Sequence, residues 1–552
     1  MNTNKINLNF SLLYYLFFAA LILVQPITAA KGTENNLVNV KWLEKNLINP
    51  EVLILDASPN QIYILKHIPG AVSVDLLSWY GLNEKPVTEM EKLFQAWGIS
   101  NEKKIIVYDQ GGTMLATRLF YSLYYYGFPL KNLFILDGGL FKWQETGYTV
   151  VKDIEPAQQG TFKIKNIKED IRVKLPEFIN ASGDPANNVL LDALGADWHF
   201  GEVLAFNRAG HIPNAVLVPS TDFYNPDKTF KSAEEIEIMM DYFDIKPTQK
   251  IYTHCGGGVA ASVPFFALKF ILNYPKVALY WESEMGWLSD ERELPYWTYD
   301  APFLMRGTNW LHFWGGDKIR MFGGADLSIV DVRSAEAFNK GHVPFSVNIP
   351  SDKFKSNIAT LNNLEEILKF SGITESDEAV IISGSGITKE AALAFVVLEK
   401  MAQKKVSLFI DSLDKWTQSG FSLTKETTVI RHSKNRSGLS ITSAAYPHNY
   451  RNGVLITNAE STPGFYTRIL IASGKNVPAK NFSSKVVHIP YSELLNGENK
   501  PKPAKDIWKI LDQAGIPRYA ELVCISDDPG EAAINYFILK LMGYPDIKVM
   551  ML

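Results

Sequence analysis

Short apolar runs that end in a polar residue recur along the chain, and each is followed by a stretch with helical periodicity. In one example, the apolar run at residues 105–108 ends at Asp109, and residues 114–124 then show the pattern of an apolar helix. Strand-length runs that alternate with helical patterns are typical of parallel sheets covered by helices. The pattern therefore predicts an α/β fold.

The same order of segments repeats four times, at a spacing of roughly 130 to 145 residues. A repeat of this length corresponds to whole domains in tandem, because short-repeat solenoids have periods of about 20 to 50 residues. A chain of 552 residues is also too long for one hydrophobic core. We predict a signal peptide and four units, each a small parallel β-sheet flanked by helices: residues 1–30, then 36–155, 165–300, 310–425 and a degenerate unit at 445–552.

The first thirty residues differ from the rest of the chain. Lys5 precedes a continuous apolar run at residues 12–24, and Thr28, Ala29 and Ala30 form a small-residue cleavage site. The apolar run is shorter than the ~20 residues that a bilayer-spanning helix needs, so a cleaved signal peptide is favoured over an uncleaved anchor. We expect a secreted or periplasmic protein with no stable membrane span after cleavage.

One strand end carries a cysteine followed by three glycines. Residues 251–254 lead into Cys255, residues 256–258 are all glycine, and residues 261–272 show the pattern of an apolar helix. Glycines let successive backbone N–H groups point inward, which makes an anion cradle at the positive end of the helix. This placement favours a thiol pKa below the ordinary value of about 8.5. It predicts a nucleophilic Cys255, against the alternative of a buried packing cysteine.

The corresponding strand ends of the other units carry Asp109, Ser383 and Ser526, none of which is a thiol. The second of the two cysteines, Cys524, lies inside an apolar run at residues 522–525 that is typical of a buried strand. We therefore expect Cys524 to be an inert packing residue, and we expect no disulfide between the two cysteines.

Composition excludes some functions. The net charge of −4 provides no basic surplus to neutralise phosphates, so we expect no nucleic-acid partner. The nine histidines and two cysteines show no metal-ligand spacing along the chain, and neither a metal nor another cofactor is expected.

Together these features resemble the rhodanese, or thiosulfate sulfurtransferase, family, and the resemblance extends over nearly the whole mature chain as four tandem rhodanese-like domains. In three units the same marks recur in order: an aspartate that ends an early strand, a His-Ile/Val-Pro turn, the site loop and a late strand that leads to a tryptophan. Because these histidines also occur in units without a site cysteine, we expect them to brace turns and not to be catalytic. The residues are Asp56, Asp192 and Asp331; His67, His211 and His342; and Trp143, Trp287 and Trp416.

The resemblance implies that Cys255 carries sulfur as a persulfide, held by the backbone N–H groups of a short loop. The donor would be thiosulfate or 3-mercaptopyruvate, and the acceptor a thiol, cyanide or a protein. Small neutral residues after the cysteine resemble the mercaptopyruvate type, and the absence of a basic residue distinguishes the loop from that of a related phosphatase branch. The loop residues are Gly256, Gly257, Gly258, Val259 and Ala260.

The sequence departs from the family pattern at one substrate-binding position. Relatives often carry an arginine directly after the Asp-Ala of the cysteine-bearing domain, but here Leu194 follows Asp192 and Ala193, and the arginine occurs in unit three as Arg333. Arg208 matches another pocket arginine of the family and is the candidate for binding the substrate anion. The alternative is a solvated loop arginine.

The function predicted from sequence is an extracytoplasmic sulfurtransferase that works by double displacement through Cys255. The alternative is a non-catalytic sulfur carrier or protein-binding scaffold, since three units have no cysteine at the site position. A third interpretation is redox sensing by a reactive thiol. His254, next to the nucleophile, is expected to point away from it because side chains alternate along a strand.

Overall fold

The computed structural model describes residues 35–80, 85–154, 156–204, 206–321, 326–428, 449–457 and 464–552. It contains four five-stranded sheets, and every strand pair within them is parallel. The predicted fold of four α/β units is therefore confirmed. The predicted signal peptide at residues 1–30 lies outside the described residues.

Unit one shows the strand order that all four sheets share, in which the strand before the site loop is central. Its order is β1-β5-β4-β2-β3, with β1 (Leu37–Val38), β2 (Val52–Asp56), β3 (Ala71–Ser73), β4 (Lys104–Tyr108) and β5 (Leu133–Leu136). Its helices are α2 (Val40–Lys45), α3 (Asn60–Tyr63), α4 (Leu76–Tyr80), α5 (Val87–Ala96), α6 (Leu115–Tyr125) and α7 (Gly139–Glu145).

Unit two repeats this order as β6-β10-β9-β7-β8, and the helix that follows its site loop has an unusual end. The predicted helix at residues 261–272 begins as α11 (Ser262–Phe266) and widens into a π-helical turn, η4 (Ala267–Ile271), where Leu272 N donates to Ala267 O at 3.0 Å. The strands are β6 (Arg172–Val173), β7 (Asn188–Asp192), β8 (Ala215–Leu217), β9 (Lys250–His254) and β10 (Val277–Tyr280). The other helices are α8 (Leu175–Ser182), α9 (Ala196–His199), α10 (Ala233–Tyr242) and α12 (Ser283–Leu288).

Units three and four keep the same strand order. Unit three has β11 (Met305–Arg306), β12 (Leu327–Asp331), β13 (Ser346–Asn348), β14 (Glu378–Ile382) and β15 (Lys405–Phe409), with α13 (Thr308–Gly315), α14 (Asp317–Met321), α15 (Ala335–Lys340), α16 (Ser351–Ser356), α17 (Leu361–Phe370), α18 (Lys389–Lys400) and α19 (Leu413–Gln418). Unit four has β16 (Leu455–Ile456), β17 (Arg468–Ala472), β18 (Lys485–His488), β19 (Glu521–Ser526) and β20 (Ile547–Met551), with α20 (Ala504–Gln513) and α21 (Pro529–Leu541). Short 3-10 turns occur at η1 (Leu130–Asn132), η2 (Glu169–Ile171), η3 (Ser220–Phe223), η5 (Pro302–Leu304) and η6 (Tyr491–Glu493).

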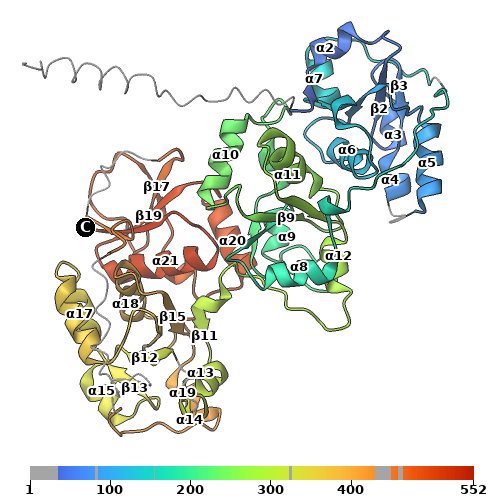
Figure 1. Ribbon diagram of the computed structural model, residues 1–552. Helices are drawn as coiled ribbons and strands as arrows, with labels where there is room; N and C mark the ends of the chain where they lie inside the picture. Colours follow the sequence, from blue (N-terminus) through green and yellow to red (C-terminus); the bar gives the residue numbers. More distant parts are fainter. Residues whose placement is uncertain are drawn as a thin grey trace, which may run out of the picture.

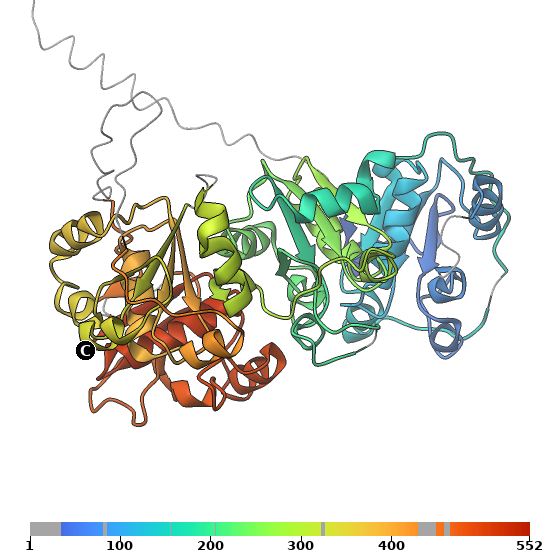
Figure 2. The ribbon, with the colours of Figure 1, turned by 90° about the horizontal axis from the view of Figure 1, so that it is seen from below.

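The units pack in two pairs, which appear as two lobes in Figure 2. In the first pair, Phe120 of α6 packs edge-on against Phe266 and Phe270 of unit two, with ring centroids 4.9 and 5.1 Å apart. In the second pair, Phe395 of α18 and Phe537 of α21 pack in the same way at 5.1 Å. Each pair thus has one continuous core, built around the helices that follow the site loops.

The two pairs meet through units two and four, where α20 lies beside α9 (Figure 1). The Tyr242 hydroxyl donates to the backbone oxygens of Arg518 and Ala520 at 3.1 and 2.9 Å. Lys509 pairs with Glu202 across the same interface at 2.6 Å. Unit four is therefore in direct contact with the cysteine-bearing unit.

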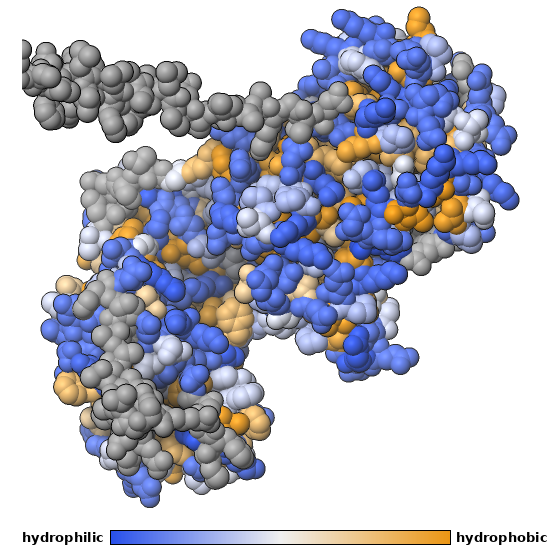
Figure 3. Space-filling model, in the orientation of Figure 1, coloured by the Kyte–Doolittle hydropathy of each residue, from blue (hydrophilic) through white to orange (hydrophobic). Residues whose placement is uncertain are grey.

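The surface seen in Figure 3 is mostly hydrophilic, with smaller hydrophobic areas between the polar residues. Most large apolar side chains instead lie in the cores of the units. Within the described ranges, no helix is both long and apolar enough to cross a bilayer.

Candidate active site

Cys255 directly follows β9, where the central strand of unit two gives way to the loop before α11. The backbone N–H of Gly258 donates to Cys255 Sγ at 3.1 Å. The backbone N–H of Cys255 is held by the Ser283 hydroxyl at 3.1 Å, and its carbonyl accepts from Glu284 N at 3.0 Å. The cysteine is thus fixed from both sides, and only 2% of its surface is exposed.

The loop requires glycine at Gly258. Its φ of +78° lies in the left-handed region, and a Cβ built there would lie 2.4 Å from the Trp281 carbonyl oxygen. At Gly256, a Cβ would meet the Phe206 ring at 3.1 Å. The glycines therefore let the loop pass close to β10 and to Phe206 while its N–H groups face the sulfur.

Burial raises the pKa of the Cys255 thiol above its ordinary value, although the N–H groups of Ala261, Gly257 and Gly258 and the Ser283 hydroxyl oppose the rise. The expectation of a lowered pKa is therefore wrong. The reason is desolvation, which outweighs the hydrogen-bond donors of the loop. The resting thiol is protonated at neutral pH.

In unit one, the same kind of loop holds its own carboxylate. Asp109 accepts N–H groups from Gly111 at 2.8 Å, Leu115 at 3.1 Å and Ala116 at 2.9 Å, together with the hydroxyl of Thr113 at 2.5 Å. The loop geometry thus stabilises an anion in practice, and in unit one the protein itself supplies that anion.

In units three and four, the residue at the site position is likewise hydrogen-bonded to a group of its own unit. The Ser383 hydroxyl donates to Gly386 O at 2.6 Å, and the Ser526 hydroxyl donates to a carboxylate oxygen of Glu531 at 2.7 Å. Unit two alone among the four places a thiol in this position.

A buried chain of charged side chains lies behind the site loop. Asp192, at the end of β7, accepts from His199 Nδ1 at 2.8 Å, and His199 Nε2 contacts Asp300 at 2.5 Å. Burial opposes protonation of His199, but Asp300 and Asp192 raise its pKa above the ordinary value. Burial also opposes ionisation of Asp300, yet His199 and Arg518 hold its pKa below the ordinary value. The two carboxylates therefore favour the imidazolium form of His199.

His211 stacks on His199, with ring centroids 3.6 Å apart, and its Nδ1 contacts His199 O at 2.8 Å. Units one and three have an aromatic ring in place of His199: His67 stacks on Tyr63 at 3.9 Å and His342 on Phe338 at 3.7 Å. The repeated histidine thus occupies the same bracing position in each of these units. Among these three units, only unit two has a second imidazole as the stacking partner.

We expect His211 to make the stability of unit two depend on pH. Burial and the neighbouring His199 lower the pKa of His211 to about 3, whereas an unfolded histidine titrates near ~6.5. The folded state therefore binds one proton fewer, and stability that is present above about pH 6.5 is lost as the pH falls toward 3. The slope is about 1.4 kcal/mol per pH unit.

Urea unfolding of the wild type and of His211→Gln between pH 6 and 4 measures this effect. The variant lacks the titrating ring, so its free energy of unfolding should fall less steeply, by the equivalent of one proton. Equal slopes in the two proteins would contradict the assignment.

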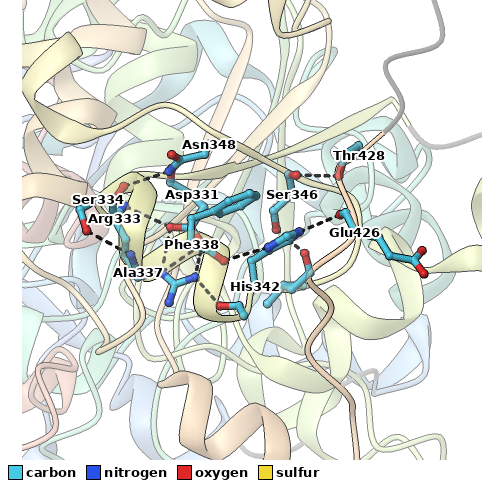
Figure 4. A network of polar contacts seen from close by, with 12 residues as sticks. Asp331, Arg333, Ser334, Ala337, Phe338, His342, Ser346, Asn348, Glu426 and Thr428 are labelled. Atoms are coloured by element: carbon cyan, nitrogen blue, oxygen red, sulfur yellow. Dashed lines mark hydrogen bonds and ion pairs between the residues drawn. The ribbon is translucent and has the colours of Figure 1, made fainter.

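The arginine missing from unit two has a structural role where it occurs, in unit three (Figure 4). Arg333 Nη2 donates to Asp331 at 2.6 Å and to Gly341 O at 3.0 Å, so its charge is used inside the unit. In unit two, Leu194 stands in that position and His199 balances the aspartate instead. The exchange of arginine for leucine is thus accompanied by a histidine that replaces the lost charge.

Arg208, the sequence candidate for anion binding, is half-buried and not in contact with the loop through any described hydrogen bond. Its guanidinium donates to Leu294 O at 2.6 Å and lies 5.4 Å from the ring centre of Tyr296. Tyr296 in turn bonds the Glu284 carboxyl, whose backbone N–H holds Cys255 O. The structure thus places Arg208 at the edge of the site, connected to the loop through two residues.

His254 lies on the α8 face of the sheet, where its ring packs edge-on against Phe178 at 5.4 Å. Burial lowers its pKa to about 4, and burial also raises the pKa of the nearby Glu284 to about 9. Both side chains are uncharged at neutral pH, and both lie close to Asp192. His254 is therefore not placed as a base for Cys255.

Several site residues were not predicted from the sequence. Ser283 and Phe206 contact the loop backbone, and Glu284, His199 and Asp300 form the polar layer behind it. Ser283 and Glu284 both lie between the late strand of unit two and Trp287. This segment therefore contributes directly to the site, although the sequence comparison used only its tryptophan.

Comparison with known proteins agrees with the fold. A sequence profile for the rhodanese-like domain matches residues 39–146, 176–290 and 317–419. The sulfur carrier protein TtuD of Thermus thermophilus is 28% identical over 266 residues, which cover 46% of this chain and 93% of TtuD. A putative thiosulfate sulfurtransferase of Synechococcus elongatus is 30% identical over 273 residues, which cover 46% of this chain and 83% of that protein. The structure of SseA from Escherichia coli, a 3-mercaptopyruvate sulfotransferase, matches with a TM-score of 0.41 and 28% identity, over 45% of this chain and 98% of SseA.

Proposed function

The chain belongs to the rhodanese-like domain family, and from this premise we propose that it is an extracytoplasmic sulfurtransferase with Cys255 as its nucleophile. The donor is thiosulfate or 3-mercaptopyruvate, and the acceptor is cyanide, a thiol or a protein. One observation carries the proposal: Cys255 Sγ accepts the Gly258 N–H at 3.1 Å inside a loop whose other N–H groups also face the sulfur. Relatives at 28% to 30% identity that bear sulfur-carrier and sulfurtransferase names support it.

In the first half-reaction, Cys255 releases its proton to solvent and the thiolate attacks the outer sulfur of thiosulfate or the thiol sulfur of 3-mercaptopyruvate. With thiosulfate, the S–S bond breaks and sulfite leaves with the bonding electron pair; with 3-mercaptopyruvate, the C–S bond breaks and pyruvate leaves after gaining a proton. The product on the enzyme is a Cys255 persulfide. The N–H groups of Gly257, Gly258 and Ala261 stabilise negative charge on sulfur throughout, as unit one does for its own carboxylate.

In the second half-reaction, the acceptor attacks the terminal sulfur of the persulfide and the Cys255 thiolate leaves. Cyanide gives thiocyanate, and a thiol gives a new persulfide. This double displacement regenerates the enzyme without any further cofactor. Arg208, half-buried beside Tyr296, is the candidate cation for the carboxylate or sulfonate end of a donor.

The proposal is tested by intact-mass spectrometry of the purified chain after incubation with thiosulfate and, separately, with 3-mercaptopyruvate. We expect one added sulfur on Cys255 and its removal by cyanide, with the donor that gives the fuller adduct as the preferred one. A free Cys255 thiol that gains no sulfur from either donor would contradict the proposal.

The second candidate is a sulfur carrier that receives and delivers persulfide sulfur without turning over small molecules. The buried cysteine and the name of TtuD favour it. A carrier would form the Cys255 adduct but transfer it to cyanide no faster than a free persulfide does. Steady-state thiocyanate formation therefore separates the two functions.

The extracytoplasmic location rests on the sequence of residues 1–30 alone. N-terminal sequencing of the protein recovered from a secreting host tests it. The mature protein should begin near Lys31, and recovery of an uncleaved chain in the cytoplasm would refute this part of the proposal.

A further inference from the structure

Three ionisable side chains converge behind the site loop without being used by the proposed reaction. One ligand atom each of Asp192, His254 and Glu284 can be chosen so that all three lie within 4.8 Å of one another. All three residues are fully buried, with at most 1% of their surface exposed. Asp192 and His254 are 62 residues apart along the chain, and His254 and Glu284 are 30 apart, so no local motif contains all three.

Two members of the cluster have side-chain atoms without a hydrogen-bond partner among the described residues. Neither ring nitrogen of His254 has a partner among the described residues, and the same holds for one carboxyl oxygen of Glu284. Buried polar atoms in folded proteins almost always have a partner, so unpaired atoms that face one another call for a bound group among them. A group that fits this position is a Lewis acid, which accepts electron pairs from an imidazole nitrogen and from carboxylate oxygens at the same time.

We propose that Asp192, His254 and Glu284 bind a divalent transition-metal ion of the zinc type. Zinc takes imidazole nitrogen and carboxylate oxygen as ligands, whereas calcium and magnesium prefer oxygen alone. Metal binding displaces the proton of Glu284, whose negative charge then faces the ion together with that of Asp192. A tetrahedral zinc site holds its ligand atoms about 3.4 Å apart, so closing the cluster requires side-chain shifts of about an ångström.

Outer partners already orient two of the ligands. Asp192 accepts the backbone N–H of Leu194 at 3.0 Å and His199 Nδ1 at 2.8 Å. Glu284 is bonded by the Tyr296 hydroxyl. Metal ligands are commonly held in this way, and such partners fix the direction of the lone pairs.

The cluster is confined to the unit that carries the cysteine. Asp192 and His254 are register partners on β7 and β9. The equivalent register pairs in units one, three and four are Asp56 with Tyr108, Asp331 with Ile382, and Ala472 with Ile525, none of which offers an imidazole.

A bound ion would join the three segments that hold the nucleophile. Asp192 ends β7, His254 is the residue before Cys255, and the Glu284 backbone bonds Cys255 O at 3.0 Å. The ion would fix the strand end from which the site loop departs. Its role is to position the loop, since no donor or acceptor sulfur reaches the α8 face of the sheet where His254 packs.

The test is a zinc titration of the full chain after removal of metals by a chelator, with a fluorescent zinc indicator as competitor. We expect one zinc per chain. The variants His254→Ile, which copies units three and four, and the isosteric Glu284→Gln should each weaken binding by more than about 100-fold, since loss of an outer partner alone costs about 10- to 100-fold. Glu282→Gln, which removes a half-exposed carboxylate two residues away, should bind zinc like the wild type.

Cys255→Ser distinguishes this site from binding by the thiolate. It should keep its zinc, and cobalt bound to the wild type should show no thiolate-to-cobalt charge-transfer absorption. The proposal is overturned if the stripped wild type binds no zinc, if Cys255→Ser loses it, or if both His254→Ile and Glu284→Gln retain it. None of these results depends on whether the chain transfers sulfur.

Discussion

Replacement of Cys255 by serine will lower sulfur transfer by at least about a thousandfold while leaving the fold intact. A serine hydroxyl fits the same space, and Gly258 N can still donate to it, so the loop keeps its geometry. The hydroxyl cannot form a persulfide, and no other described side chain in the loop is a nucleophile. The measurement is thiocyanate formation from thiosulfate or 3-mercaptopyruvate and cyanide, with circular dichroism to show the fold.

Cys524→Ala is the matched control for this experiment. Cys524 lies in β19, fully buried, and burial raises the pKa of its thiol far above the ordinary value with no opposing hydrogen bond. Its removal should therefore leave transfer unchanged. Equal losses in the two variants, or full activity in Cys255→Ser, would show that the sulfur is carried elsewhere.

The fold could be predicted because its signals are local and repeated. The apolar run at residues 105–108 fell within the strand β4, and the cysteine fell at a strand end as its glycines indicated. The fourfold repeat also helped to locate the strands, because a strand with a weak pattern in one unit has a clear counterpart in another. Parallel βαβ order then leaves few arrangements to choose from.

The site could be predicted only in part, because its chemistry depends on burial and on distant residues. The glycine loop indicated a lowered thiol pKa, but the depth of Cys255 is a property of the packed pair of units, and desolvation reverses the direction. His199 contacts Asp300 across 101 residues, and Asp300 reaches Arg518 across 218. No motif spans such separations.

The exchange at Leu194 shows the same limit. From sequence, the missing arginine indicated a weakened substrate site, because its counterpart Arg333 was compared with substrate-binding arginines of relatives. The structure shows Arg333 bonded to Asp331, and His199 bonded to the equivalent Asp192. Leu194 thus removes a positive charge beside Asp192, and His199 supplies one from another position of unit two.

Replacement of Arg518 by leucine will lower the free energy of unfolding by about 3 kcal/mol, although Arg518 belongs to unit four. Its guanidinium lies 3.4 Å from Asp300 and also donates to Met542 O at 3.0 Å. Asp300 in turn pairs with His199, so the four charges on Asp192, His199, Asp300 and Arg518 cancel. Without the arginine, a buried carboxylate is left uncompensated, which is costlier than losing the pair as a whole.

Arg292→Leu provides the matched control, because Arg292 makes two hydrogen bonds to Asp290 at 2.7 and 2.8 Å but its side chain is 63% exposed. Water screens that pair, so its loss should lower the free energy of unfolding far less than the loss of Arg518 does. Arg518→Lys keeps the charge and should recover part of the stability that Arg518→Leu loses. Urea unfolding of the full chain, followed by tryptophan fluorescence, measures all three variants.

This comparison decides what unit four contributes to the cysteine-bearing unit. If Arg518→Leu is no more destabilising than Arg292→Leu, unit four merely touches unit two through exposed contacts. If Arg518→Leu is clearly the more destabilising of the two, a unit without a site cysteine supplies the cation that balances the polar layer behind Cys255. Its arginine then serves the active site from a different domain, which gives a physical reason for the second pair of units to remain attached to the first.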